Sequence, residues 1–483
     1  MTDDLSTVEP PRMDRLDEAS VETIHEASIT ILEEMGIKVD HEEGQKILAE
    51  NGCSVDDEGM VTFPRSLVED CVDEAPANFT LHGRGEGTDV DVGGDDYVLV
   101  PSGGPPNVVK YDEDRRPSRM EDYEEFVKLA HMEDVVQSSG LNVCEPNDVD
   151  QSVKHVEMML RNLTLSDMPP QGSTYGADRA EACIEMVGIA NDDPDVSKPY
   201  LAAVANSVSP RTWDTKMTGG LLTYARHGQP VVASPAVMAA ASGPATLAGA
   251  MALANAEILA GVTMTQLVNP GTPVVYGLPS SNVDVRYGSF AIGSPEGALF
   301  VSFAGQMARH YGIPSRAGGG LTDAKTMDDQ QGSEAMLQLL TTMTSGINYV
   351  LHAAGVLDSY STASPEKFVL DCDRIRYVQR FVEGFDVDEE TLALDLIEEV
   401  EPGQHFLNKR HTLEHSKTEF LIPEIYDRDS YDNWESAGEK TAYELAHERV
   451  GTLLDEYERP PIDEDIEHDL ERYVEEKREE ILG

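Results

Sequence analysis

Two strand-like runs end between residues 318 and 359, each in residues that can do chemistry. The first run ends at Gly319 and Gly320, and glycine lets a flat ligand approach the backbone closely. A polar loop and a helix follow, and the second run ends in the sequence His-Ala-Ala-Gly. Because α/β barrels place catalytic groups where parallel strands end, this segment predicts one side of an active site. Its candidate catalytic groups are Asp323, Gln331, Glu334 and His352.

Each of these groups also has a purely structural interpretation. His352 lies in an otherwise apolar run, where a histidine is either hydrogen-bonded within the core or an orienting group beside a ligand. Acidic side chains near the start of a helix are stabilised by the helix dipole, which accounts for some of the carboxylates between 323 and 334. The strand-end rule adds Asn206, which follows another strand-like run, as a candidate for binding a substrate.

Three tyrosines have the chemistry to hold a cation: Tyr97 and Tyr276, close to other strand-like runs, and Tyr360. An aromatic face attracts a quaternary ammonium group by roughly 0.5–2 kcal/mol. Each tyrosine can instead be a core or rim residue, so the sequence leaves both interpretations open.

Lys325 permits a different chemistry, because a lysine at a barrel strand end can form a Schiff base with a carbonyl substrate. This predicts a lyase or aldolase as an alternative. The carboxylates of Asp323, Asp328 and Asp329 would stabilise the charged, non-nucleophilic form of the lysine, which disfavours that alternative. A protein that binds the same ligand without turnover is a further alternative.

Alternating strand-like and helical stretches from residue 119 to 375 predict the element that positions these groups. About eight repeats favour a closed (β/α)8 barrel of the TIM type, and no G-x-G-x-x-G turn supports an open nucleotide-binding sheet. We expect residues 1–118 to form an N-terminal helical cap with a β-hairpin region, and residues 376–483 to form an acidic, helical C-terminal extension. The strand-like runs lie at 136–144, 200–208, 230–234, 273–278, 313–320 and 348–355, with weaker ones at 172–175 and 368–370.

The charge of the chain restricts its partners. Its 483 residues include 90 Asp and Glu against 36 Lys and Arg, a net charge of −54. Nucleic acids and anionic membranes attract the opposite sign, so neither is expected as a partner. Such acidity is typical of a salt-rich cytoplasm, where a Debye length of about 3 Å at 1 M salt screens self-repulsion. The five cysteines form no CxxC pair, and residues 1–11 lack the apolar run of a signal peptide, so we expect a cytoplasmic protein without disulfides or zinc.

Motifs spread along most of the chain are shared with one family. They are Ile31-Leu-Glu-Glu-Met-Gly-Ile-Lys-Val, Ala75-Pro-Ala-Asn-Phe-Thr-Leu-His-Gly-Arg, Pro101-Ser-Gly-Gly-Pro-Pro-Asn, Leu321-Thr-Asp-Ala-Lys with Asp329-Gln-Gln-Gly-Ser-Glu, and His352-Ala-Ala-Gly with Thr362-Ala-Ser-Pro-Glu-Lys-Phe. By these motifs the chain resembles the trimethylamine:corrinoid methyltransferase family.

The resemblance implies a barrel enzyme that moves a methyl group from a methylated amine to the Co(I) corrinoid of a separate small protein. It implies no permanently bound cofactor, but a cobalamin (corrinoid) presented by that partner, and we expect a homo-oligomer. The founding trimethylamine enzymes carry pyrrolysine, which this sequence lacks. The donor is therefore expected to be a quaternary amine such as a betaine, whose neutral-amine leaving group needs no proton. His352 would then orient the substrate or the corrinoid.

Overall fold

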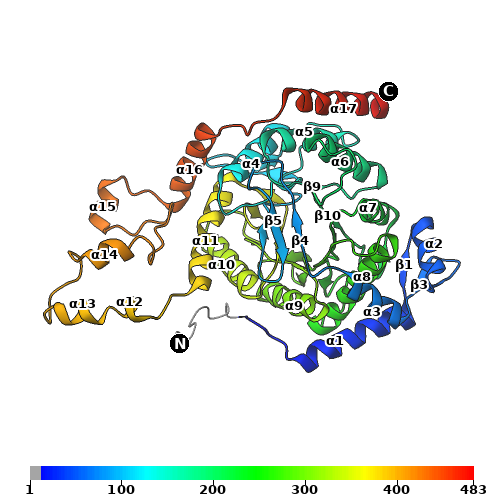
Figure 1. Cartoon of the computed structure of the whole chain (residues 1–483), viewed down its shortest axis with the longest axis horizontal. Helices are drawn as coiled ribbons and strands as arrows, with labels where there is room; N and C mark the ends of the chain where they lie inside the picture. Colours follow the sequence, from blue (N-terminus) through cyan, green and yellow to red (C-terminus); the bar gives the residue numbers. More distant parts are fainter. Residues whose placement is uncertain (1–11) are drawn as a thin grey trace.

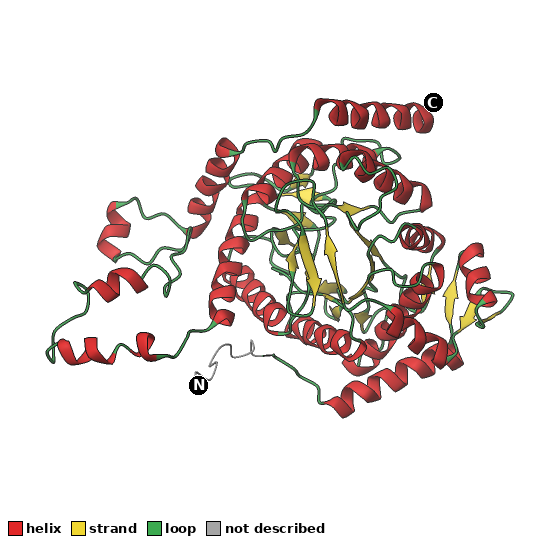
Figure 2. Cartoon of the chain, viewed as in Figure 1, coloured by secondary structure: helices red, strands yellow, loops and turns green. Residues whose placement is uncertain are grey.

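The computed structural model describes residues 12–483, so the expectation for residues 1–11 lies outside the described part. Its centre is a sheet surrounded by a ring of helices (Figure 2). Seven strands pair in series, and all their pairings are parallel. In sheet order they are β6 (Val98–Leu99), β18 (Tyr349–Val350), β17 (Ser315–Arg316), β14 (Val274–Gly277), β12 (Val231–Ala233), β10 (Ala202–Ala205) and β9 (Gln171–Gly172).

The seven strands do not complete the predicted eight-stranded barrel. Residues 136–144, where the sequence predicts a strand, lie between the edge strands β6 and β9 and share backbone hydrogen bonds with both. The Gln137 amide donates to the Leu99 carbonyl (3.1 Å), and the Gln171 amide donates to the Gly140 carbonyl (3.1 Å). Gly140 has a φ of 67°, a left-handed conformation that a regular strand does not contain, so no continuous ladder forms there.

Eight helices of 12 to 22 residues pack around this sheet, in the order in which the sequence predicts alternation. They are α4 (Met120–Met132), α5 (Lys154–Leu165), α6 (Ala177–Ala190), α7 (Thr215–Arg226), α8 (Leu247–Val268), α9 (Pro295–Tyr311), α10 (Asp329–Thr344) and α11 (Pro365–Glu383). Among the described residues α8 alone is long and apolar enough to span a membrane. It is mostly buried, and it packs against α7 and the N-terminal helices as a core helix.

Capping residues explain where α9 and α10 begin. α9 starts after Ser294, whose side chain accepts a hydrogen bond from the Gly297 amide, with Pro295 in its first turn. α10 starts after Asp328, whose carboxylate accepts a hydrogen bond from the Gln331 amide. Ser and Asp satisfy free amides at a helix start, and proline is tolerated there because its missing N–H is not needed.

The seven-stranded sheet and residues 136–144 enclose an incomplete barrel, which we call the barrel, and a β-hairpin fills one end of its interior. It consists of β4 (Asn78–Leu81) and β5 (Val90–Gly93) and lies at the centre of the ring in Figure 1. Its apolar side chains form one cluster with the inward-facing residues of the barrel strands, which include Phe79, Leu81, Val92, Val98, Ala202, Val232, Val275 and Tyr349. The interior is therefore packed at this end by the described residues.

Two sequence predictions within the barrel are wrong. Val98–Leu99 is a barrel strand paired with β18, not part of a hairpin region before the barrel, because its short buried run is too brief to reveal its partner. The sheet therefore begins before the predicted boundary at 119. Residues 368–370 lie inside α11 rather than in a strand. Ser364 and Pro365, a typical start of a helix, precede that apolar run.

The N-terminal region packs on the outside of the ring beside α8 (Figure 1). Its helices are α1 (Glu18–Thr30), extended by a π-helical turn at Ile31–Met35, α2 (Glu42–Glu50) and α3 (Arg65–Glu74). β1 (Ile37–Val39), β2 (Ser54–Val55) and β3 (Met60–Thr62) form a small sheet with β11 (Thr212–Trp213), which ties the region to the barrel.

The C-terminal region is helical, as its periodicity predicts. Four short helices, α12 (Glu389–Leu392), α13 (Leu394–Glu399), α14 (Arg410–His415) and α15 (Tyr431–Ser436), extend away from the ring (Figure 1). α16 (Ala442–Glu456) returns to pack against α11 and α4, and α17 (Glu464–Leu482) packs against α5 and α6.

Candidate active site

A cavity of about 970 Å³ opens at the carboxyl ends of the barrel strands. Residues that follow β9, β10, β12, β14, β17 and β18 line it, together with the first turns of α5 and α6. Its volume lies within the usual range for small-molecule sites. The position is the one at which barrel enzymes build their active sites.

Arg316, at the end of β17, is the most unusual group in the cavity wall. The side chain is buried, yet its guanidinium makes one hydrogen bond, from Nη1 to Ser234 Oγ (3.3 Å), and its Nε has no partner. Among the described residues it forms no ion pair with a carboxylate. Burial lowers the pKa of Arg316 from its ordinary value, but arginine stays protonated in proteins. An unpaired cation in a low-dielectric wall is therefore free to bind an anion from the cavity.

His352, which follows β18, lines the same cavity. Its Nδ1 accepts a hydrogen bond from the Gly103 amide (2.9 Å), and burial and then the charge of Arg316 hold its pKa well below the ordinary value. The ring is therefore neutral, with its proton assigned to Nε2 by that hydrogen bond. Its φ of 66° is in the left-handed region, which a non-glycine residue adopts only when its surroundings hold it there.

Two aromatic rings lie together on the wall of the cavity. The Tyr360 ring centroid is 4.5 Å from that of His352 and 6.2 Å from that of Phe290. Phe290 lies on the hairpin formed by β15 (Ser281–Asp284) and β16 (Ser289–Ala291). Tyr360 and Phe290 both line the cavity, so their faces or edges are available to a cationic group.

The lining of the cavity carries more positive than negative charge, although the chain carries a net −54. Its cations are Arg316, Lys154 and Arg179, and its one acidic residue is Glu145. Glu145 pairs with Lys154 at 3.3 Å. The uncompensated charge therefore lies on the two arginines, and it favours a ligand with an anionic group.

Of the nine predicted catalytic and substrate-binding residues, four lie at or beside the cavity, two lie elsewhere, and three belong to hydrogen-bond networks described below. His352 and Asn206 line it, while Gly319 and Gly320 are buried behind it. Tyr97 instead lines a separate cavity with Gln379, whose side chain donates to its hydroxyl (3.0 Å). Tyr276 is fully buried, and its hydroxyl donates to Asn255 Oδ1 (2.9 Å). The cage that the sequence predicts from Tyr97 and Tyr276 is therefore not assembled, because the two side chains face different surroundings.

Asp323 and Glu334 hold together the loops that carry the two aromatic rings. The Asp323 carboxylate accepts hydrogen bonds from the Ile292 and Gly293 amides (3.0 and 3.1 Å) and from Ser359 Oγ (2.5 Å). Ile292 follows the strand of Phe290, and Ser359 precedes Tyr360. Burial raises the pKa of Asp323. Glu334 in turn accepts from the Asp323 amide and from Thr322 Oγ1, both at 2.7 Å. A catalytic role for either carboxylate stays a prediction.

Gln331 and Gly320 belong to a buried network behind Arg316 and His352. Lys367, which is fully buried, donates to the Gly320 carbonyl (2.7 Å) and pairs with Asp371. Asp371 accepts from the Gly355 amide (2.9 Å) and from Arg374 (2.7 Å), and Arg374 also donates to Gln331 Oε1 (2.9 Å). Burial lowers the pKa of Lys367 to about 8. The network joins the loop after β17 to the loop after β18.

Gly319 makes the contact between these two loops possible. It has a φ of 116°, and a Cβ at this position would lie 2.2 Å from the His352 carbonyl oxygen. The next amide, that of Gly320, donates to the carbonyls of His352 and Ala353, each at 3.0 Å. A side chain at 319 would therefore separate the loop from the strand end that carries His352.

Lys325 is not placed for Schiff-base chemistry. Its side chain is 70% exposed and lies 3.6 Å from Asp358. A Schiff-base lysine is activated in a desolvated pocket, whereas this side chain lies in water beside a carboxylate. The residues that sequence reasoning missed are Arg316 and Phe290. A single arginine within the predicted buried strand 313–320 was the available signal for the first, and Phe290 gave none.

Comparisons with known proteins agree on one family. The profile described as trimethylamine methyltransferase (MTTB) matches residues 4–482. A glycine betaine methyltransferase of Desulfitobacterium hafniense is 41% identical over 423 residues, which cover 87% of this chain and 88% of that protein. The trimethylamine methyltransferase MttB of Methanosarcina barkeri is 29% identical over 458 residues, covering 89% of this chain and 88% of that protein.

A solved structure shares the fold. The crystal structure of the monomethylamine methyltransferase MtmB of Methanosarcina barkeri aligns with a TM-score of 0.56 and 13% sequence identity, covering 93% of this chain and 90% of that one. At this identity the likeness concerns the fold alone.

Proposed function

The chain belongs to the trimethylamine methyltransferase family and is an enzyme of the methyltransferase type, and we propose that its methyl donor is a quaternary amine that also carries a carboxylate, such as a betaine. The acceptor in this proposal is the Co(I) corrinoid of a separate protein. The 41% identity to a protein named glycine betaine methyltransferase supports this choice of donor. Trimethylamine, which has no anionic group, would leave the arginine in the cavity wall unpaired.

The observation that carries the proposal is the buried, unpaired Arg316. Burial of a charge without a counter-charge costs several kcal/mol, so a ligand that supplies the counter-charge gains this energy on binding. The planar guanidinium matches the two oxygens of a carboxylate. The neutral His352, with its proton on Nε2, offers a further donor on the same wall.

The cationic end of the donor has a matching surface in Tyr360 and Phe290. When the methyl group leaves a quaternary nitrogen, the electron pair of the broken C–N bond stays on nitrogen and a neutral tertiary amine is released. No proton is transferred, which agrees with a site whose histidine is held neutral. The residues of the cavity have to bind and orient the donor, and such positioning lowers the activation free energy by about 7–11 kcal/mol in favourable cases.

The corrinoid would supply the nucleophilic cobalt that takes the methyl group. Gly103 and Gly104 line the cavity without side chains, and a flat ring would approach it from their side. A Cβ at Gly104 would have no heavy atom within 4 Å, so this part of the rim is open space.

A methyl-transfer assay with a reduced corrinoid protein tests the proposal. In buffer with molar salt, the panel would contain glycine betaine, tetramethylammonium and trimethylamine at equal concentrations. We expect glycine betaine to be the best donor by kcat/KM, because it alone has both charged ends. Faster transfer from trimethylamine than from either quaternary amine would refute the assignment.

A further inference from the structure

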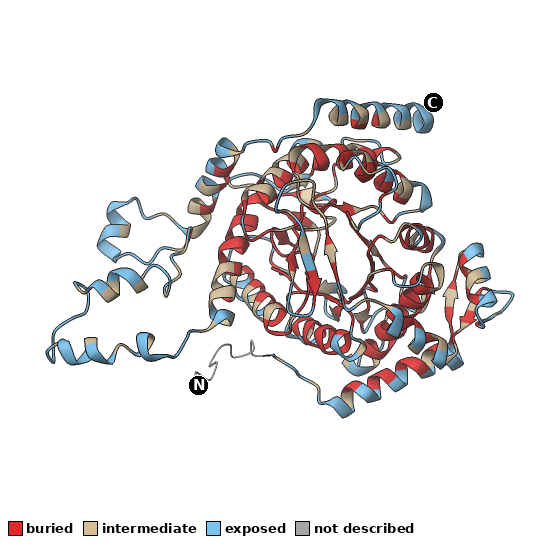
Figure 3. Ribbon diagram, viewed as in Figure 1, coloured by how far each residue is buried: buried red, intermediate tan, exposed pale blue. Residues whose placement is uncertain are grey.

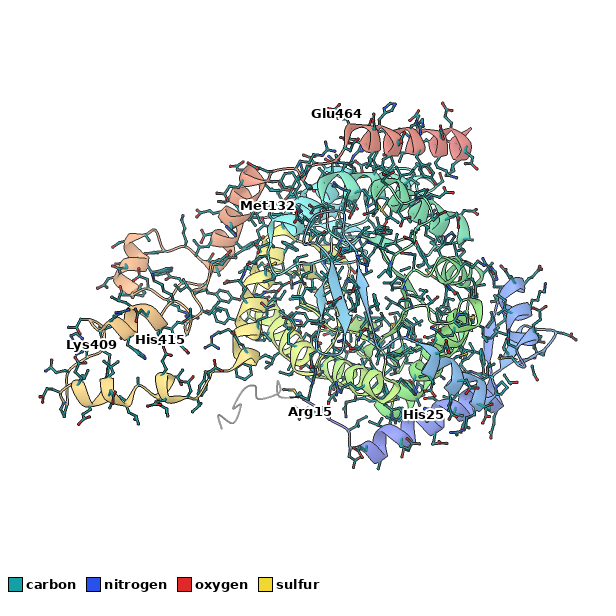
Figure 4. All side chains as sticks on the ribbon, in the orientation of Figure 1. Arg15, His25, Met132, Lys409, His415 and Glu464 are labelled. Carbon is teal, nitrogen blue, oxygen red and sulfur yellow. The ribbon has the colours of Figure 1, made fainter. Side chains whose placement is uncertain are left out.

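One segment of the chain packs on almost nothing: residues 385–436, which we call the arm. It carries α12–α15 and extends sideways from the ring of helices (Figure 1), and it is exposed along its length (Figure 3). These four helices contain no buried residue, and Ile425 alone in the arm is buried. Lys409, just before α14, and His415, at its end, lie well away from the barrel in Figure 4.

The arm is nevertheless rich in large apolar side chains. Of the 21 large apolar residues that are exposed among the described residues, 11 lie on the arm, and the other ten are scattered over the rest of the surface. The arm carries Phe385, Val387, Leu392, Leu394, Ile397, Phe406, Leu407, Leu413, Phe420, Ile422 and Tyr431. Concentrated apolar exposure of this kind marks an interaction surface.

The arm is fixed at its root, so it does not simply fold back onto the barrel. The Asp373 carboxylate on α11 accepts hydrogen bonds from the amides of Glu424, Ile425 and Tyr426. Arg380, also on α11, donates to the Glu419 carbonyl (2.9 Å). These contacts anchor residues 419–426 against α11, and the arm lies beside the ring of helices (Figure 1).

We infer that the arm is covered by a second copy of this chain, arm against arm. Obligate interfaces are more apolar than transient ones, so the many apolar side chains of the arm fit a partner that stays bound. A corrinoid protein must leave after each methyl transfer, and it has to reach the cavity, whereas the arm lies to the side. In the described part of the chain, the arm is also the largest concentration of apolar side chains that could match it.

The size of the surface suits a stable dimer. The four aromatic side chains of the arm would bury on the order of 600 Å², and seven aliphatic side chains lie beside them. A standard interface buries about 800 Å² on each partner. Contact between identical surfaces is the arrangement of a two-fold dimer, in which each arm meets the same residues of the other.

The charge of the arm adds a salt dependence. The arm carries fifteen acidic residues against four basic ones, so two arms repel each other unless salt screens them. With a Debye length of about 3 Å at 1 M salt and 30 Å at 0.01 M, we expect association in molar salt and dissociation in dilute buffer.

Light scattering coupled to size exclusion tests the inference on the full-length protein. In about 1–3 M salt, which screens the charges of the arm, we expect a mass at least twice the 52.8 kDa of one chain. Leu407→Asp with Ile422→Asp should reduce it to one chain. Leu482→Asp, at an exposed apolar residue outside the arm, is the matched control and should keep the mass of the unchanged protein. Circular dichroism checks that each variant is folded.

Two results would overturn the inference. A mass of one chain for the unchanged protein at micromolar concentration in molar salt would show that the arm has no copy as its partner. An unchanged oligomer in the folded double variant would show that the copies associate through another surface. Both readouts are independent of methyl transfer, so they do not depend on the proposed donor.

Discussion

Replacement of Arg316 by methionine should stabilise the free enzyme or leave its stability unchanged while it removes binding of a carboxylate donor. The guanidinium is buried with one 3.3 Å hydrogen bond and an unpartnered Nε, so the free protein contains a charge without a counter-charge. An apolar side chain of similar length in place of a buried charge is often neutral or stabilising by about 1–4 kcal/mol. The melting temperature should therefore stay the same or rise.

The same replacement should weaken binding of the donor. Loss of one partner of a buried, hydrogen-bonded charge pair costs about 2–5 kcal/mol of binding, and each 1.4 kcal/mol is a factor of ten. The KM for glycine betaine should rise by roughly thirtyfold to several thousandfold. Tetramethylammonium has no carboxylate, so its kcat/KM should change by less than about tenfold. Arg316→Lys keeps the charge but not the planar fork, and should give an intermediate KM.

The assay compares methyl transfer from glycine betaine and from tetramethylammonium in the unchanged enzyme and the two variants, with thermal unfolding alongside. An equal loss of kcat/KM for both donors in Arg316→Met would refute the reasoning, because a carboxylate-binding residue cannot act on a donor without a carboxylate. A melting temperature lowered by several degrees would also refute it, because it would mean that Arg316 is satisfied within the protein.

Three further predictions concern other parts of the site. Tyr360→Leu should raise the KM for the quaternary amine about two- to thirtyfold through the lost cation–π contact, whereas Tyr276→Phe should leave KM unchanged and lower stability by about 1–3 kcal/mol through the lost bond to its buried acceptor. Lys367→Met breaks a buried ion pair and should cost about 3–5 kcal/mol of stability in denaturant unfolding, against less than about 0.5 kcal/mol for the exposed Lys325→Met. Burial lowers the pKa of His155 to about 4, so between about pH 6.5 and 4 the unfolded chain binds a proton that the folded one does not. The free energy of unfolding should therefore decrease as the pH is lowered through this window, and it should decrease less steeply in His155→Gln.

Each of these predictions has an outcome that would contradict it. A raised KM in Tyr276→Phe would place that hydroxyl at the substrate, and an unchanged KM in Tyr360→Leu would remove the ring from cation binding. Equal free energies of unfolding for the two lysine variants would mean that the buried ion pair of Lys367 does not stabilise the fold. An equally steep pH dependence of unfolding with and without His155 would place the acid sensitivity on other groups.

The sequence predicts the helices of the barrel better than its strands. α5 to α10 are long and periodic, so an error of two or three residues at their ends does not change their identity. The strands β6, β17 and β18 are two residues long, and a run of that length has no period of its own. Residues 136–144 have the composition of a strand, but Gly140 takes a left-handed conformation that the composition does not disclose.

The sequence also predicts some residues of the candidate site correctly and misplaces others. The strand-end rule finds His352 and Asn206, because parallel strands bring their carboxyl ends together wherever the chain places them. The rule misplaces the two tyrosines for reasons of direction. Tyr97 precedes β6 and lies at the other end of that strand from the cavity. In β14 the side chains alternate, and since Val275 faces the barrel interior, Tyr276 has to face the helices.

The same alternation explains how Arg316 reaches the cavity. Arg316 pairs with Gly277 of β14, which faces inward because Tyr276 faces outward. At Gly277 a Cβ would lie 2.7 Å from the Ser234 side chain, the group to which Arg316 donates. A strand position without a side chain thus leaves the space through which the guanidinium crosses from β17 towards β12. The role that we propose for Arg316 rests on the lack of a carboxylate partner among the described residues. This property depends on the register of three strands rather than on any motif in the sequence.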